Sequence, residues 1–188
     1  PGNDMIQDDI HTHLTRVLET HRTGDHDTAR AEAAELVSVA PDVPDTHFVM
    51  GLLMQDGGEH SSAIQLLGRA IRMDPERSDF HDALGVSQVS LGKHREALRS
   101  FAESVRMAPE NRVAVMHLGL LTLRMGLPER ALPCFESLMS MGETSVELVC
   151  LRGQSLYLLD RHVEAIEWLH KCLDLDPTHI DSIHYLGR

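Results

Sequence analysis

Histidine and cysteine are the residues of this sequence that could bind a transition metal or act as nucleophiles, and the chain has 13 histidines and three cysteines. Seven of the histidines recur at multiples of 34 residues, in two sets: His13, His47 and His81, and His26, His60, His94 and His162. This spacing indicates equivalent places in a repeat, where neighbouring copies lie on the order of 10 Å apart. Zinc ligands must instead converge within about 2.1 Å of one ion. We therefore predict that these histidines are structural and that the chain binds no metal.

The cysteines form no recognisable catalytic or redox motif. Cys134, Cys150 and Cys172 are odd in number and lie outside any Cys-x-x-Cys pattern, so reduced, buried thiols in a reducing compartment are the simpler interpretation. Their spacing singles out no Cys-His or Ser-His-Asp set, and no glycine-rich phosphate loop is present. We predict a non-enzymatic, cytoplasmic protein with no catalytic residue and no cofactor.

The elements that must carry these residues are short helices in a 34-residue repeat. In residues 78–111, apolar residues from Phe80 to Leu91 recur with helical spacing, Gly92 interrupts them, and a second helical pattern ends at Pro109. Aromatic residues are only 4% of the chain, which favours helix over strand. Three series share the spacing: Pro41, Pro75, Pro109 and Pro177, with Glu143 in the missing place; Gly51, Gly85, Gly119 and Gly153; and Ala29, Ala63, Ala97, Ala131 and Ala165.

This pattern resembles the tetratricopeptide repeat family. The third repeat carries Leu84-Gly85, Ala97, Phe101 and Pro109 at the positions that define the family's motif. The resemblance implies an all-α fold, a right-handed α-solenoid of stacked helix-turn-helix repeats. It predicts a tail or cap at 1–9 and repeats at 10–43, 44–77, 78–111, 112–145 and 146–179, with a partial sixth at 180–188.

Three places depart from the repeat pattern. In the first repeat Arg16-Val17 replace Leu-Gly, so we expect its first helix to pack less tightly and to act as a cap. The fourth repeat lacks the closing proline, and we expect a looser junction at 140–145 that could act as a hinge. The sixth repeat stops within a helix, which predicts an uncapped end at 180–188 that frays or mediates self-association.

In members of the family, the first helices of the repeats line a concave groove that holds a peptide or helix of a partner. The carboxylate clamp of the chaperone-binding members is absent, because Leu14 and Leu18 replace its Lys and Asn. Most of the equivalent side chains here are apolar, which favours the apolar face of a partner helix or extended peptide. The resemblance places in this groove Leu14, Leu18, Phe48, Leu52, Gln55, Asp82, Val86, Val89, Met116, Leu120, Leu123, Cys150, Gln154 and Tyr157.

Acidic residues follow one edge of the predicted groove. Asp45, Asp79, Glu147 and Asp181 all stand at the second position of a repeat. Acids there stabilise the start of a helix through its macrodipole, and they could also orient a basic flank of the partner. The net charge of −12 argues against a nucleic acid partner. No apolar run approaches the roughly 18 residues of a membrane span, which argues against membrane insertion.

We therefore predict a protein-protein interaction module that binds a protein or peptide partner in an apolar groove with an acidic edge. The alternative is the substrate-selecting or regulatory arm of a larger enzyme, of the glycosyltransferase, sulfotransferase or methyltransferase type, whose catalytic domain is absent from this chain. A self-assembling scaffold is a third interpretation.

Overall fold

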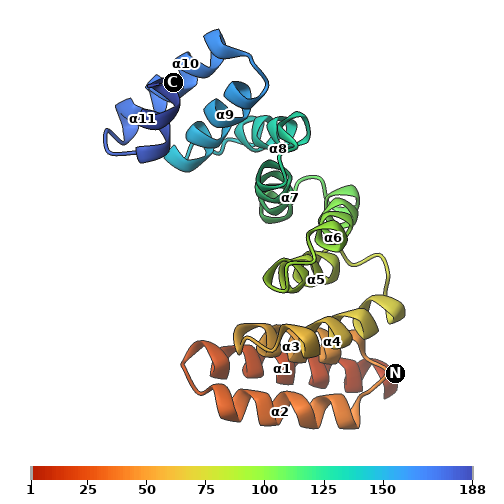
Figure 1. The fold of residues 1–188 in the computed structure, drawn as a ribbon. Coiled ribbons are helices and arrows are strands. Elements are labelled where there is room, and N and C mark those ends of the chain that lie inside the picture. The colour runs from red at the N-terminus through yellow and green to blue at the C-terminus, as the bar shows by residue number, and fades with distance from the viewer. Residues whose placement is uncertain (1, 188) are drawn as a thin grey trace. The chain divides into compact units, whose positions relative to one another are not determined.

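The computed structural model describes residues 2–187, and its side chains from residue 9 onward. This part of the chain is all-α, with eleven helices and no strand, and the predicted fold class is confirmed (Figure 1). The helices are α1 (Gly2–Arg22), α2 (His26–Val39), α3 (Pro44–Asp56), α4 (His60–Met73), α5 (Ser78–Ser90), α6 (His94–Met107), α7 (Arg112–Arg124), α8 (Pro128–Ser140), α9 (Val146–Leu158), α10 (His162–Leu175) and α11 (Ile180–Leu186).

The helix starts follow the 34-residue spacing. The first helices of the repeats start at Pro44, Ser78, Arg112, Val146 and Ile180, and the second helices start at 26, 60, 94, 128 and 162. Helix α1 is longer, with 21 residues from Gly2, so it includes residues 2–9 of the segment predicted as a tail or cap. Within residues 2–187, no helix is both long enough and apolar enough to cross a membrane.

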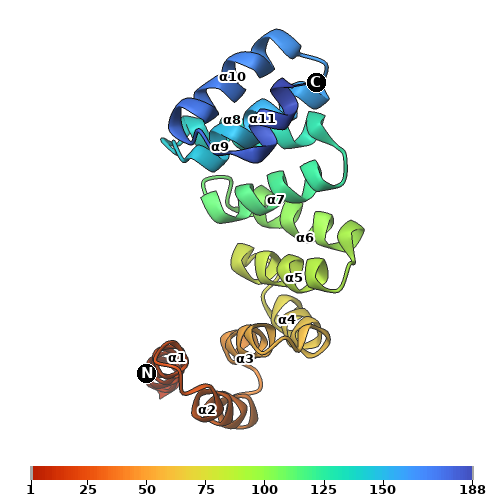
Figure 2. The ribbon, with the colours of Figure 1, turned by 60° about the vertical axis from the view of Figure 1, so that its left-hand side comes forward.

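The chain forms two compact units, one ending at Met107 and the other beginning at Ala108. In the first unit each of α1 to α6 packs on its neighbour in sequence, and α3 also contacts α1 and α5. In the second unit α7 to α11 pack in the same way, and α11 also contacts α9 (Figure 2). In each unit, every helix therefore packs on the next one along the chain, as stacked repeats require.

In the second to fifth repeats, a glycine of the first helix packs directly against a large side chain of the second helix. A Cβ atom on Gly85 would lie 2.5 Å from Cε1 of Phe101 in α6, and one on Gly119 would lie 2.7 Å from Cε1 of Phe135 in α8. The other two pairs, Gly51 with Leu67 and Gly153 with Leu169, would place the nearest atom at 3.0 Å. The large side chain of the second helix thus fills the space over the glycine.

The first repeat reverses this arrangement of small and large residues. Val17 stands at the glycine position, and Ala33 stands where the other repeats have Phe or Leu. Both are buried, at 0% and 1% exposure, and belong to one apolar cluster with Leu14 and Val49. At this point the small residue in α2 makes room for the large one in α1. The two helices still share fewer contacts than the helix pairs of the later repeats, which agrees with the expectation of a looser first helix.

Residues with positive φ close the turn between the helices of each repeat. Gly92 has φ 72°, and Asp160 occupies the equivalent place in the fifth repeat with φ 58°. The junction at 140–145 has its own turn at Gly142, and Ser145 caps α9 by accepting a hydrogen bond from the Leu148 amide. Arg112 of α7 donates to Glu143 and to the Met141 carbonyl across this junction. A hinge at this place stays a prediction.

The close approach at Gly85 leads to a stability prediction. We expect Gly85→Ala to destabilise the chain by about 1–3 kcal/mol, because its methyl group would overlap the Phe101 ring. The measurement is the urea midpoint by circular dichroism. Gly68→Ala in α4 is the matched control, because a Cβ there meets only Arg72 Nη1 at 3.6 Å. It should stabilise by about 0.5–1 kcal/mol through helix propensity. Equal effects of the two substitutions would contradict the packing argument.

The reversed pair in the first repeat leads to a second prediction. Ala33→Leu should destabilise the chain by about 1–3 kcal/mol through overpacking against Val17. Adding Val17→Gly should restore much of that loss, since it recreates the arrangement of the other repeats. A double-mutant cycle in urea should give a coupling energy of about 1 kcal/mol or more. Additive effects would show that the two side chains do not compensate for each other.

Candidate functional site

In the first unit, the predicted groove residues differ in how much of each side chain reaches solvent. Leu14 is buried in the core, so its side chain cannot directly contact a partner. Leu18 is 40% exposed. The remaining predicted residues are half-buried on α3 and α5: Phe48, Leu52, Gln55, Asp82, Val86 and Val89.

An arginine lies within the predicted acidic edge of this unit. Arg77, the N-cap residue of α5, donates from Nε and Nη2 to the two carboxylate oxygens of Asp79, at 3.0 and 2.7 Å. Its Nη2 also lies 3.2 Å from Oδ1 of Asp45 on α3. The guanidinium stands 4.4 Å from the centroid of the Phe80 ring, which packs on Phe48 at 4.7 Å. The edge is therefore an Asp-Arg-Asp cluster over two aromatic rings instead of a row of free carboxylates.

Arg77 keeps its positive charge, because its guanidinium lies between two carboxylates. The hydrogen bond with Asp79 is the main reason why the pKa of Arg77 lies above its ordinary value, and the charges of Asp79 and Asp45 add to it against the effect of burial. Sequence reasoning missed this residue because it considered only the second position of each repeat. The signal was an arginine directly before the start of α5, with an aspartate two residues later.

In the second unit, the predicted groove residues also differ in burial. Met116 and Leu120 of α7 are half-buried, whereas Leu123 and Cys150 are buried and cannot form part of an open surface. On the acidic edge, Glu147 and Asp181 are exposed.

The predicted groove residues of α9 contact α11. Gln154 donates to the Tyr185 hydroxyl at 2.9 Å, and the rings of Tyr157 and Tyr185 lie 4.9 Å apart. On the same helix as Tyr185, the side chains of Ile180 and Ile183 are exposed. Whether residues 180–188 fray or self-associate stays a prediction.

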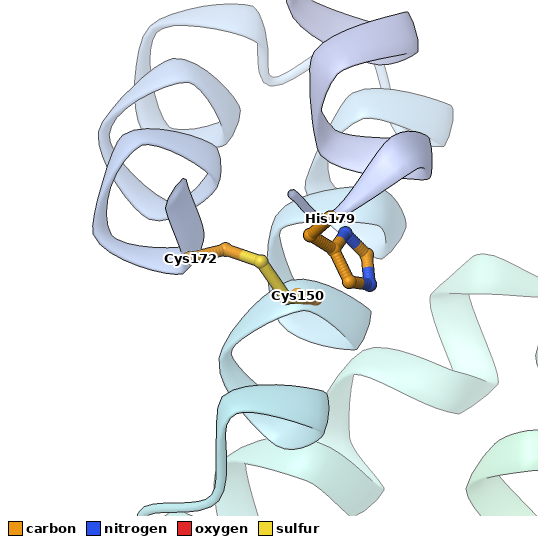
Figure 3. Close-up of side chains that lie close together, drawn as sticks. All are labelled: Cys150, Cys172 and His179. Carbon is orange, nitrogen blue, oxygen red and sulfur yellow. A yellow bond between two sulfur atoms is a disulfide. The ribbon is translucent and has the colours of Figure 1, made fainter. Parts of the chain in front are cut away.

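The structure corrects the expectation of three reduced cysteines. Cys150 of α9 and Cys172 of α10 form a disulfide, and His179 lies beside it (Figure 3). One ligand atom from each of these three residues lies within 4.8 Å of the others. Sequence spacing could not reveal this set, because the residues come from three different elements. Cys134 is a free thiol, and burial raises its pKa, which keeps it protonated and weakly nucleophilic.

His47 and His81, each the fourth residue of its repeat, contact the preceding repeat. Nε2 of His47 lies 2.9 Å from the Pro41 carbonyl, and Nε2 of His81 lies 3.0 Å from the Pro75 carbonyl, so each ring donates to the proline that ends the preceding repeat. His13 instead contacts the Asp9 carbonyl within α1.

The second set of histidines, His26, His60, His94 and His162, stands at the first residue of α2, α4, α6 and α10. In this set, His26 Nδ1 lies 3.0 Å from His21 Nδ1, and His21 Nε2 lies 2.9 Å from Asp56. Sequence reasoning did not predict these contacts.

A hollow of about 750 Å³ lies between α1 and α2, outside the predicted groove. Ile10, Val17 and Leu36 form part of its apolar lining, and Arg16 and Glu32 stand 3.5 Å apart at its side. Its mixture of apolar and charged residues does not indicate a particular ligand.

Solved structures of other proteins share this fold at low sequence identity. YrrB, described as a TPR protein with an unusual peptide-binding site, is 17% identical, with a TM-score of 0.80 over 94% of this chain and 91% of that chain. PilF of Pseudomonas aeruginosa is 17% identical, with a TM-score of 0.76 over 98% and 90% of the two chains. MamA of Desulfovibrio magneticus RS-1 is 16% identical, with a TM-score of 0.77 over 91% and 97%. At these identities the likeness shows the fold alone.

No curated protein matches the sequence. The family model described as tetratricopeptide repeat matches residues 48–111, 83–138 and 118–180. These matches run without a gap from 48 to 180, which is more than half of the 188 residues. The chain therefore belongs to the tetratricopeptide repeat family.

Proposed function

We propose that this chain is a non-enzymatic interaction module that binds an amphipathic helix or extended peptide on the first helices of its repeats. The observation that carries the proposal is the row of half-buried apolar side chains on those helices. In the first unit the row consists of Phe48 and Leu52 on α3 and Val86 and Val89 on α5, and these two helices are in contact. In the second unit it consists of Met116 and Leu120 on α7.

The degree of burial of these side chains suits recognition. A half-buried side chain is already held by its neighbours, so its ordering on binding costs less entropy than that of a fully exposed one. Its remaining apolar surface still gains by leaving water. The peptide-binding site of YrrB, which has the same fold, is consistent with this use of the repeats.

The charges refine which partner is expected. Asp45 and Asp79 share Arg77, so this edge of the first unit can receive an acidic or a basic group of the ligand through different members of the cluster. Glu147 and Asp181 in the second unit are exposed, and the net charge of the chain is −12. A ligand with a basic flank should therefore associate faster at low salt, with a smaller effect on the affinity.

A selected peptide can test the groove without knowledge of the natural partner. Peptides chosen by phage display on the wild-type chain should lose at least tenfold in affinity with Leu52→Glu or with Leu120→Glu, because a buried apolar anchor contributes on the order of 1–2 kcal/mol or more. The measurement is fluorescence anisotropy with the labelled peptide. A glutamate in place of either leucine would remove the apolar contact with the peptide. Its carboxylate would also lose water when the peptide binds.

The controls place the same change outside the groove. Val39→Glu on α2 and Val163→Glu on α10 alter side chains that are 68% and 76% exposed, and should leave the affinity within about twofold. Circular dichroism should show the same helical signal for all four variants. Equal binding by both groove variants would rule out this surface as the binding site.

A further inference from the structure

The buried cluster around Cys150 has a composition that packing alone does not explain. In the fourth repeat the equivalents of Cys150 and Cys172 are Met116 and Leu138, and in the first repeat they are Leu14 and Leu36. Apolar side chains therefore suffice at this contact between the two helices of a repeat. The fifth repeat has two sulfur donors there, at 4% and 0% exposure.

The third member of the cluster is an unusual helix cap. Most N-caps are Ser, Thr, Asp or Asn, as Ser145 is for α9. His179 caps α11 instead, with its Nδ1 accepting a hydrogen bond from the Ser182 amide at 3.2 Å. The Ser182 hydroxyl lies 2.9 Å from that nitrogen and 3.1 Å from the sulfur of Cys172. The imidazole lies beside the sulfur pair (Figure 3). The buried Ser182 contacts both the imidazole and the sulfur of Cys172.

Two thiolates and one imidazole form a donor set that suits zinc. Zn²⁺ prefers sulfur and nitrogen ligands in a tetrahedron, at about 2.3 Å and about 2.1 Å, and sites with three protein ligands keep the fourth position for water or another ligand. One ligand atom from each of Cys150, Cys172 and His179 lies within 4.8 Å of the others, a spacing at which the three residues could hold one ion. A hydroxyl such as that of Ser182, close to a ligating sulfur, would hold that sulfur in place.

We propose that the reduced form of this cluster is a zinc site, formed by Cys150, Cys172 and His179, and that the disulfide is its metal-free, oxidised form. The proposal departs from the expectation, drawn from the spacing of the histidines, that the chain binds no metal. The two forms exclude each other, because sulfur atoms bonded to one another cannot serve as thiolate ligands. Reduction by a dithiol delivers two electrons and two protons, which yields two thiols and converts the dithiol to a disulfide. Zinc binding then displaces one proton from each thiol.

The site would join three elements of the second unit. The disulfide links α9 to α10, whereas the zinc ion would also hold His179 at the start of α11. A neutral imidazole that ligates zinc can no longer accept the hydrogen bond from the Ser182 amide, because its one lone pair is used by the ion. The link through the ion to α9 and α10 would replace that bond, so zinc should hold α11 against the second unit in a way that the disulfide does not. This gives the proposal a structural readout besides metal binding.

The test uses the full chain with Cys134→Ser, which removes the one free thiol of the described part. It is reduced with a phosphine, which takes its oxygen from water and leaves no competing thiol. Added Co²⁺ should give tetrahedral ligand-field bands and sulfur-to-cobalt charge transfer, at one ion per chain, and Zn²⁺ should displace it. Zinc should raise the Tm of the reduced chain by several degrees and slow hydrogen exchange at the amides of Ile183 to Leu186.

His179→Asn is the decisive variant, because asparagine keeps a good N-cap but provides no imidazole. It should lower zinc affinity at least tenfold while the reduced, metal-free chain keeps its Tm. Cys150→Ala and Cys172→Ala should abolish the charge-transfer band, with circular dichroism to verify folding. The oxidised chain should bind neither ion.

Three results would overturn the proposal. The first is a Cys150–Cys172 disulfide that the phosphine reduces only after the chain unfolds. The second is a reduced chain that shows no sulfur-to-cobalt band. The third is a His179→Asn variant that binds zinc as tightly as its parent.

Discussion

In the second to fifth repeats, a glycine of the first helix packs against a large side chain of the second helix, and this contact constrains the geometry of the repeat. A methyl group on Gly85 would lie 2.5 Å from the Phe101 ring, so the ring occupies the space that a side chain at this position would need. Packed interiors tolerate overlap poorly, so a larger residue at Gly85 would require the ring or the helices to move. Where Val17 replaces the glycine, Ala33 replaces the large residue, so the summed side-chain size matches that of the Gly51–Leu67 pair in the next repeat.

This contact influences which side chains of each helix are buried and which reach solvent. Once α5 and α6 are locked at Gly85, the side chains of α5 near Val86 and Val89 are half-buried, and those of its opposite face are in the core. The same geometry recurs every 34 residues, so α3 presents Phe48 and Leu52 in the same way. The predicted binding surface therefore needs no additional element, because it is the face of the first helices that the packing contacts leave partly exposed.

The periodicity made the helices predictable, since proline and glycine punctuate the chain at a constant spacing and the family resemblance supplies the pairing. Side-chain partners were predictable only where they repeat. Arg77 occurs in one repeat only, so no series pointed to its contacts with Asp45 and Asp79. To predict the disulfide between Cys150 and Cys172, one must know which residues of the two helices face each other. Their separation of 22 residues carries no such signal. Burial of Leu14 and Leu123 was missed because the family pattern gives the direction of a side chain but not what covers it.

The cluster of Cys150, Cys172 and His179 lies between the packed helices of the fifth repeat and the predicted groove residues of that repeat. Cys150 belongs to the register that elsewhere places Phe48 and Met116 on the partially exposed face, but here it points to Cys172 and is buried. His179 caps the helix that carries Tyr185, and Tyr185 contacts Gln154 and Tyr157 on α9. A change of chemistry at the sulfur atoms would therefore act on the start of α11 and, through Tyr185, on two predicted groove residues. In the fifth repeat, buried residues of the core therefore also influence the positions of the adjoining groove residues Gln154 and Tyr157.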